Sequence, residues 1–395
     1  MQNAAINNFI KIVRAGLDNS FNVLLDELNI DDIYNLARSH QVSGIVYSGA
    51  INLGIDSNLT SMQKLYVAAV SELTMHERQM SVLSTISKRF DEESIDYMPL
   101  KGSVVKQYYP KPEMRIMGDI DILVKVEDFA RIKSIMESLG AAEKYESDHE
   151  YVWCTSSNVI VEFHKMLVPT YNEIYCDFFK SGWDRAIKNN NSSRHAMSKE
   201  DEFVYTFTHF AKHYRAGGIG VRQLCDIWLM LSTLSLDNNY LKDSFIKLGL
   251  FEFYENVLKT LEVWFCEAEP DKITDMISNT IILGGSFGTH KSKTNALVVR
   301  SAEGKKNVKK ARLLMFKVKV FPPVKFIAFK YTFLKSKPWL LPVAWVMRWF
   351  DVVFNRRKSI GNTLKSISEV NADDVIKYEN EIRMVGLNFD TKEKK

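Results

Sequence analysis

The chain has 395 residues, of which 46% are hydrophobic and 25% charged, an ordinary composition for a globular protein with room for two or three domains. Its net charge of +4 hides an asymmetry, because residues 304–358 hold 15 Lys or Arg residues and one acidic residue, Asp351, while the rest of the chain is acidic. Four widely spaced cysteines without a CxxC pair argue against a zinc or disulfide framework, and the lack of a secretory signal pattern or an 18-residue apolar run argues against export and a transmembrane helix.

Apolar residues recur at helical spacing from about residue 5 to residue 90, and the longest helix is predicted to start at Asn58 or Thr60 and to end near Arg89. From Ile95 to His164 the pattern changes to short strands that alternate with helices. We expect strands at 95–100, 119–124, 150–154 and 159–164, and helices at 102–108 and 127–139.

From Ser198 onward the chain is predicted to be helical again, with Ser198 as a helix cap and a second helix at 221–234 after the Gly217-Gly218 break. Residues 284–310 are rich in Gly, Ser and Lys and predict a loop. The chain thus divides into a helical region at 1–90, a mixed region at 91–195, a helical region at 196–283, and a loop with a basic, aromatic region at 284–395.

Two carboxylates, Asp119 and Asp121, lie two residues apart in the otherwise apolar segment 118–124. Side chains alternate along a strand, so both carboxylates point to one face and repel each other there. A divalent cation between them removes that penalty, and Mg²⁺ favours one or two carboxylates together with phosphate oxygens. The spacing therefore predicts a metal site for phosphoryl or nucleotidyl chemistry.

The turn before the first helix of the mixed region, Lys101-Gly102-Ser103, offers backbone N–H groups, a hydroxyl and a positive charge to a phosphate. Glu162 stands between apolar residues on a later predicted strand. If that strand lies beside 119–124, Glu162 completes a triad with Asp119 and Asp121, in which it shares a metal or takes the proton of an acceptor hydroxyl.

The order of these residues resembles the DNA polymerase beta-like nucleotidyltransferase superfamily, whose members share a Gly-Ser turn, an Asp-x-Asp strand and a third acidic residue. More closely, it resembles a bacterial family of uncharacterised nucleotidyltransferases that are often linked to surface-polysaccharide gene clusters. The residues that carry this closer resemblance are Leu100-Lys101-Gly102, Tyr109-Pro110, Arg115, 119–124, 161–164, 220–226, Phe321-Pro322 and 339–342. It covers about 61–358 and is strongest from Leu100 to Asp226.

The resemblance implies an α+β fold, with a small mixed sheet of the nucleotidyltransferase type flanked by N-terminal and C-terminal helical regions. It makes 91–195 the catalytic domain and 196–283 a helical domain that closes the cleft. It also implies a nucleoside triphosphate, one or two Mg²⁺ ions, Asp119, Asp121 and Glu162 as metal ligands and catalytic residues, and Gly102-Ser103 as the triphosphate-binding turn.

Further candidates flank this site. Lys101 and Arg115 can bind phosphates or be surface charges, and His164 shares the face of Glu162. His209 and His213, four residues apart, either line the cleft or are packed histidines, and zinc is not indicated because no HExxH pattern is present. Arg222 and Asp226, also four residues apart, predict an ion pair, although Arg222 can also reach the cleft.

The basic block at 305–358 mixes Lys and Arg with many aromatic residues, and its prolines argue against one continuous helix. It packs on the core, or lies on an anionic membrane surface, or, less favoured, binds nucleic acid. Arg348 and Asp351 interrupt its most apolar stretch, 338–354.

We therefore expect a cytoplasmic Mg²⁺-dependent nucleotidyltransferase, peripheral to the inner face of the membrane if the basic block binds lipid. It would transfer a nucleoside monophosphate to a hydroxyl-bearing acceptor, with surface-polysaccharide biosynthesis as the setting that the resemblance implies. Two alternatives are a non-catalytic membrane-surface or scaffolding protein of polysaccharide assembly, and an antitoxin-like enzyme that modifies a protein or RNA.

Overall fold

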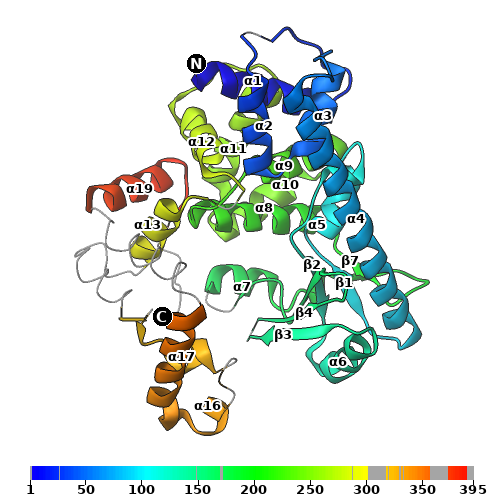
Figure 1. Cartoon of the computed structure of the whole chain (residues 1–395), viewed down its shortest axis with the longest axis vertical. Coiled ribbons are helices and arrows are strands. Elements are labelled where there is room, and N and C mark those ends of the chain that lie inside the picture. The colour runs from blue at the N-terminus through cyan, green and yellow to red at the C-terminus, as the bar shows by residue number, and fades with distance from the viewer. Residues whose placement is uncertain are drawn as a thin grey trace.

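A five-stranded mixed sheet lies at one end of a mainly helical molecule (Figure 1). The computed structural model describes residues 2–25, 27–147, 149–169, 172–286, 288–300, 317–318, 320–328, 331, 333–355 and 372–388. The expected α+β class with a small mixed sheet flanked by helices is confirmed.

The sheet has the spatial order β1-β2-β5-β4-β3, in which β2 and β5 are parallel and the other neighbours are antiparallel. Its strands are β1 (Tyr97–Pro99), β2 (Ile120–Val124), β3 (Ala142–Glu146), β4 (Glu150–Cys154) and β5 (Ile160–His164). Four of them were expected, although β1 is shorter than predicted. The edge strand β3 was missed because its side chains are mostly exposed and polar, so no apolar alternation marks it.

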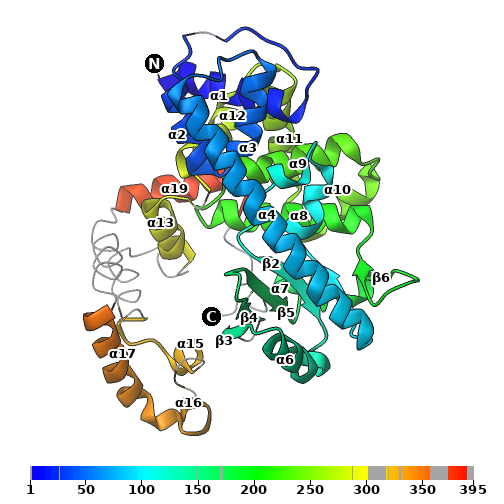
Figure 2. The same ribbon diagram turned by 45° about the vertical axis from the view of Figure 1, so that its right-hand side comes forward.

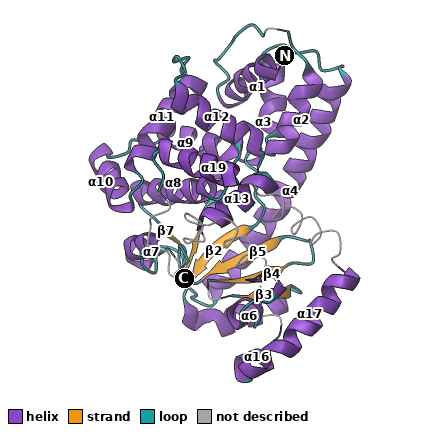
Figure 3. Ribbon diagram, turned by 90° about the vertical axis from the view of Figure 1, so that its left-hand side faces the viewer, coloured by secondary structure: helices purple, strands orange, loops and turns teal. Residues whose placement is uncertain are grey.

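One face of the sheet is apolar and packs against α4 (Thr60–Glu92) and α6 (Phe129–Ser138). Ile122 of β2 and Phe163 of β5 belong to this buried cluster, together with Phe90 of α4. Because side chains alternate along a strand, the polar residues of β2 and β5 point to the opposite face. Figure 3 shows α6 on one side of the sheet and the helices α8 (Lys199–Arg215) and α13 (His290–Arg300) on the other.

The 33-residue helix α4 connects the two cores of the molecule and is about 50 Å long. Its first half packs with the helical core through Met62, and its second half lies under the sheet. Between them, the carboxylate of Glu72 accepts hydrogen bonds from the backbone N–H groups of Ser43 and Gly44, at 3.2 and 2.8 Å. These two groups begin α3 and have no partner within that helix, so α4 fixes the position of α3 as well as that of the sheet.

The larger core joins helices from both ends of the described sequence. The helices that share it include α1 (Gln2–Leu17), α2 (Ile30–His40), α3 (Ser43–Asn52), α8, α9 (Val221–Thr233), α10 (Asn238–Leu248), α11 (Phe251–Phe265) and α12 (Lys272–Gly284). Ser198 caps α8 as expected, because its side chain accepts from the backbone N–H of Asp201. The division into four regions stays a prediction, and the N-terminal helices share one core with α8 to α12.

The prediction of a loop over 284–310 is wrong for residues 290–300, which form α13. Its first half is polar, which hid it in the sequence, but Val298 and Val299 are buried. Helix α13 packs against α19 (Ala372–Met384), and Asn256 of α11 donates to the carbonyl of Val385 just after α19. A late segment thus returns to the helical core. Residues 301–310 of the expected loop lie outside the described residues.

Short elements complete the fold: α5 (Gly102–Val105), α7 (Glu173–Phe179), the hairpin β6 (Ile187–Lys188) and β7 (His195–Ala196), and, in the basic block, α15 (Val324–Ile327), α16 (Phe333–Ser336) and α17 (Leu341–Asn355). The break of the block into separate helices agrees with its prolines. No helix in the described part of the chain is both long and apolar enough to cross a membrane.

Candidate active site

The three predicted carboxylates meet on the polar face of the sheet. Asp121 of β2 lies beside Glu162 of the parallel strand β5, and Asp119 precedes β2 by one residue on the same face as Asp121. The expectation that the strand of Glu162 lies beside that of Asp121 is therefore confirmed. The role of the three residues as metal ligands stays a prediction.

The carboxylates raise one another's affinity for protons. Burial, followed by the nearby charges of Asp119 and Asp121, raises the pKa of Glu162 from 4.5 to about 8. Burial and the charge of Asp121 also raise the pKa of Asp119. Such a set holds an excess of negative charge that a cation would stabilise.

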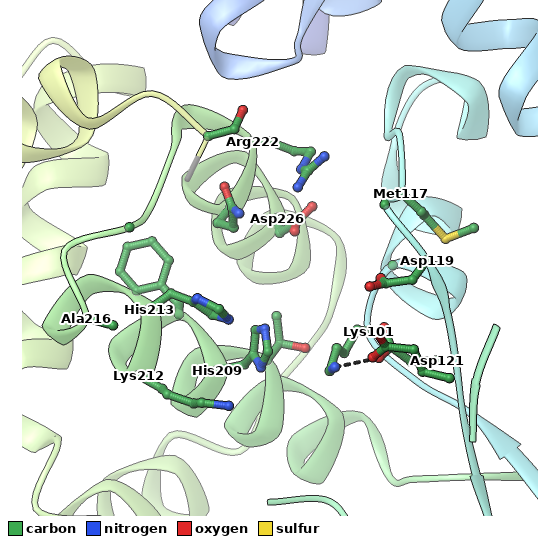
Figure 4. Close-up of a pocket in the computed structure, with 18 of the residues that line it drawn as sticks. Lys101, Met117, Asp119, Asp121, His209, Lys212, His213, Ala216, Arg222 and Asp226 are labelled. Carbon is green, nitrogen blue, oxygen red and sulfur yellow. Dashed lines mark hydrogen bonds and ion pairs between the residues drawn. The ribbon is translucent and has the colours of Figure 1, made fainter. Parts of the chain in front are cut away.

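Asp121 has two close partners, and Glu162 lies farther from one of them, with its Oε2 atom 3.7 Å from His164 Nε2. The Oδ1 atom of Asp121 lies 2.5 Å from Lys101 Nζ and 2.7 Å from His164 Nε2. Burial would raise the pKa of Asp121, but Lys101 and His164 overcome that effect and hold it well below its usual range. Burial likewise would lower the pKa of Lys101, and Asp121 keeps it above its ordinary value. Asp121 is thus ionised, with Lys101 as its counter-charge (Figure 4).

The turn that carries Lys101 has an uncommon backbone. Lys101 has a φ of +50°, a region that favours glycine and costs other residues about 1–3 kcal/mol. A Cβ atom on Gly102 would lie 2.4 Å from Arg115 Nη1 and 2.8 Å from Met117 Cγ, so a larger residue would displace these two side chains. The turn holds the lysine over the sheet, whereas the hydroxyl of Ser103 is 3.7 Å from the sulfur of Met117. The expected helix 102–108 is shorter than predicted, because α5 ends at Val105 and a 3₁₀ turn follows.

The predicted ion pair between Arg222 and Asp226 is wrong. Asp226 instead accepts two hydrogen bonds from Arg115, from Nε at 3.2 Å and from Nη2 at 2.8 Å. Arg222 donates from Nη1 to the side-chain oxygen of Gln41 and to the carbonyl of Ile116, both at 3.1 Å. The expected pair does not form because the chain segment before β2 crosses α9 and brings Arg115 to the carboxylate of Asp226.

Asp226 also accepts a hydrogen bond from the hydroxyl of Tyr109 at 2.7 Å. Burial would lower the pKa of Arg115, but Asp226 raises it, so Arg115 stays charged. Arg115 and Arg222 both line the cavity described below, and the binding of phosphate by Arg115 stays a prediction. In the structure Arg115 links the segment before β2 to α9 through Asp226.

His164 contacts a second histidine that sequence reasoning missed. His164 Nδ1 lies 3.3 Å from Nε2 of His149, and burial, with the charge of His164, lowers the pKa of His149 to about 3. One signal could have found it. An antiparallel hairpin of the predicted strands 150–154 and 159–164, with a turn at 156–158, would pair Glu150 with His164, and this pairing occurs. Potential metal-binding groups in the described residues are Asp121, Glu162 and His164, and also His149, Glu150 and His164, each with ligand atoms within 4.8 Å of one another.

A cavity of about 650 Å³ separates this face of the sheet from a wall of helices. Figure 4 shows Asp119 and Asp121 on one side and His209, Lys212 and His213 on the other. The helical wall includes Thr206, His209, Phe210, Lys212, His213, Ala216, Gly218, Arg222, Gln223, Ser286, Lys293, Ala296 and Leu297. It therefore combines α8, α9 and α13 and carries basic side chains opposite the acidic face.

His209 and His213 line this cavity. The sequence had left open whether they line the cleft or pack in the core. Their ring centroids lie 4.3 Å apart. Burial, followed by His213, lowers the pKa of His209 well below its usual value, so His209 is neutral at pH 7. Lys293 and its neighbours on α13 were missed, because their segment was expected to be a loop.

A model of the family described as uncharacterised nucleotidyltransferase matches residues 26–266, which is more than half of the chain. The match includes Leu100 to Asp226, so the expected resemblance is confirmed there. It ends before the basic block, and the resemblance of that block stays a prediction. A comparison with curated proteins gives no match.

Two solved structures are similar to about half of the chain. The antibiotic-resistance factor ANT(2'')-Ia is 14% identical with a TM-score of 0.33, over 46% of this chain and 96% of that chain. An antigenic nucleotidyltransferase-like protein from Paracoccidioides brasiliensis is 15% identical with a TM-score of 0.30, over 47% of this chain and 88% of that chain. At these TM-scores the likeness carries no argument, and the assignment rests on the family model.

Proposed function

Because the chain belongs to the family of uncharacterised nucleotidyltransferases, we propose that it transfers a nucleoside monophosphate from a nucleoside triphosphate to a hydroxyl group, with Mg²⁺ as cofactor. The observation that carries the proposal is the group of Asp119, Asp121 and Glu162 at the wall of a cavity. Three carboxylates with one close lysine form a site that gains stability from a cation.

The donor set fits Mg²⁺. Hard divalent cations prefer carboxylate oxygens, and Mg²⁺ takes one or two carboxylates and completes its shell with water and phosphate oxygens. Asp119, Asp121 and Glu162 would hold one or two ions, and Lys101 Nζ now supplies a positive charge at 2.5 Å from Asp121. Bound Mg²⁺ would neutralise charge on the reacting phosphates.

In the proposed reaction the acceptor oxygen bonds to the α-phosphorus, the bond from that phosphorus to the bridging oxygen breaks, and pyrophosphate leaves. The proton of the acceptor hydroxyl needs a base near the acidic face, and we assign this task to Glu162. Lys101 would contact the triphosphate once a cation replaces it beside Asp121, and the turn would contact the phosphates through the backbone N–H of Gly102, because the N–H of Ser103 donates to the carbonyl of Leu100 at 3.2 Å. His164 donates to Asp121 from Nε2 and would keep that carboxylate oriented.

The acceptor is proposed to be a hydroxyl-bearing molecule of surface-polysaccharide biosynthesis, as the resemblance implies. The setting is proposed to be the cytoplasm, at the inner face of the membrane. Four free cysteines are in keeping with a reducing compartment. His209, His213 and Lys212 would face the acceptor or the nucleotide from the helical wall.

The first test is calorimetric binding of each of the four nucleoside triphosphates with and without Mg²⁺. We compare the wild type with Asp119→Asn/Asp121→Asn and with a control, Asp177→Asn/Asp184→Asn, which removes two exposed carboxylates far from the cavity lining. We expect Mg²⁺-dependent binding of at least one nucleotide by the wild type and the control, and its loss in the site variant. Absence of such binding in the wild type, or its persistence in the site variant, would overturn the proposal.

A further inference from the structure

The described helices of the basic block form a small unit with its own core. Ile327, Tyr331, Leu334 and Ala344 make a separate buried cluster, and Leu341 and Trp345 pack against it. Figure 2 shows α15, α16 and α17 apart from the helical body and the sheet. This unit, residues 317–355, is named the C-terminal helical unit below.

Helix α17 is apolar on two faces. The face with Leu341, Ala344 and Trp345 covers the core of the unit, as expected for residues three and four positions apart. The other face carries Val343, Val346, Met347 and Phe350, which also follow helical spacing, and their side chains are 46–61% exposed. A helix that is apolar all round is usually buried, so this second face needs a cover.

The exposed face extends to Trp339, which is 74% exposed and lies in the 3₁₀ turn that leads into α17. Aliphatic, Phe and Trp side chains along one helix face are typical of helices that lie in a membrane interface. Helix α17 has 15 residues and is therefore about 22 Å long, shorter than the roughly 30 Å hydrocarbon core. Its length suits a position in the plane of the interface.

The positive charge of the unit favours binding to an anionic surface. Residues 317–355 contain seven Lys or Arg residues and one acidic residue, Asp351. Lys317 and Lys337 are exposed. Basic residues in a unit with an exposed apolar helix face add attraction to a surface of anionic lipids.

The aromatic residues favour lipid over nucleic acid. Binding of single strands uses aromatic rings that are free to stack on bases. Two of the tryptophans are held by hydrogen bonds within the unit: Trp345 Nε1 donates to the carbonyl of Pro322 at 2.8 Å, and Nε1 of Trp349, which is 37% exposed, donates to that of Val320 at 2.9 Å. The ring of Phe321 packs edge-on against both of them. Most of the exposed face consists of Val and Met side chains, which suit acyl chains.

We propose that the C-terminal helical unit docks on an anionic lipid surface, with the exposed face of α17 in the interface. The proposed docking gives a physical basis to the membrane location and does not depend on nucleotidyl transfer, since none of the described residues of the unit lines the cavity. The occupant of the exposed face is thus anionic lipid. Nucleic acid and a second copy of the chain are the competing occupants, and the test below distinguishes them from lipid.

The test is cosedimentation of the full chain with vesicles of phosphatidylcholine alone or with phosphatidylglycerol. The variant Val346→Asp/Phe350→Asp alters two exposed residues, and Val67→Asp/Val70→Asp is the matched control on the exposed face of α4, where the two valines are 65% and 41% exposed. We expect wild type and control to bind phosphatidylglycerol vesicles with similar affinity and the α17 variant to bind at least about tenfold more weakly. The wild type should bind neutral vesicles less, and its Trp fluorescence should shift to the blue on binding.

Equal binding by the two double variants, or no binding of phosphatidylglycerol vesicles by the wild type, would overturn the proposal. So would tighter binding of a single-stranded oligonucleotide than of the vesicles, or a dimer in sedimentation velocity that only the α17 variant loses. Mg²⁺-dependent nucleotide binding by the α17 variant, measured in parallel, separates the two proposals. If neither the wild type nor the α17 variant binds nucleotide with Mg²⁺, nucleotidyl transfer is refuted and the lipid result is unchanged.

Discussion

Replacement of Glu162 by Gln should stabilise the metal-free protein and at the same time abolish Mg²⁺-dependent turnover. Glu162 lies beside Asp121 on the sheet and close enough to Asp119 that the two aspartates raise its pKa after burial has done so. Gln has the same shape and no charge. The variant therefore removes the repulsion within the acidic face while it removes a proposed metal ligand and base.

The size of the effect follows from the pKa of Glu162, which is raised from 4.5 to about 8. Each pKa unit corresponds to about 1.4 kcal/mol, so this shift sets a ceiling of roughly 5 kcal/mol. The side chain is 18% exposed and borders an open cavity, and solvent screening reduces the figure. We expect Glu162→Gln to raise the free energy of unfolding by about 1–2 kcal/mol at pH 8.

The sign of the pH dependence is fixed. A carboxyl group with a raised pKa holds its proton more tightly in the folded chain, so the wild type loses stability as the pH rises from 4.5 toward 8. The advantage of the variant should be small at pH 5 and largest at pH 8. Excess Mg²⁺ should reverse it, since an ion that binds only the folded wild type stabilises that protein.

Scanning calorimetry at pH 5 and pH 8, with chelator or with Mg²⁺, measures these differences, and Glu127→Gln, at an exposed position, serves as the control. A variant that is less stable than the wild type at pH 8 without metal would refute the reasoning. An advantage that does not change between pH 5 and pH 8 would refute it as well.

Asp226→Asn should lower the free energy of unfolding by about 3 kcal/mol in chemical denaturation, because it leaves Arg115 buried without its carboxylate, and an effect below about 1 kcal/mol would contradict this ion pair. Gly49→Ala should lower the free energy of unfolding by about 2–3 kcal/mol in chemical denaturation, since an added Cβ would lie 1.9 Å from a backbone oxygen of α1. Gly118→Ala, where an added Cβ has nothing within 4 Å, should leave that free energy almost unchanged. Burial lowers the pKa of His40 from 6.5 to about 4, so the free energy of unfolding of the wild type should fall as the pH drops between these values. Thermal unfolding at several pH values should show a smaller fall in the midpoint temperature for His40→Gln.

The acidic face could be predicted from the sequence because it depends on local order. A period of two places Asp119 and Asp121 together, and an isolated Glu162 in an apolar strand has no simple structural use. The neighbouring position of that strand was only a condition of the expected triad, because local patterns do not determine which strands pair, and the structure shows that the two strands are adjacent and parallel.

Other parts depended on contacts between distant segments. The four-residue spacing favoured Arg222 as the partner of Asp226, but Arg115 reaches that carboxylate from 111 residues away with two hydrogen bonds. The polar start of α13 resembled a loop, and its buried valines belong to a core that also contains residues of the distant helix α19. Exposed edge strand β3 carried no apolar pattern at all.

The position of α13 also bears on how the protein is made. This helix supplies Lys293, Ala296 and Leu297 to the cavity and packs against α19, which ends at Met384. During translation the acidic face emerges from the ribosome more than one hundred residues before α13, so the cavity stays open on the α13 side until that part of the wall arrives. A polypeptide released before residue 290 would lack this part of the wall, so truncated products would carry the carboxylates opposite α8 and α9 in a cavity that is open on the side of α13.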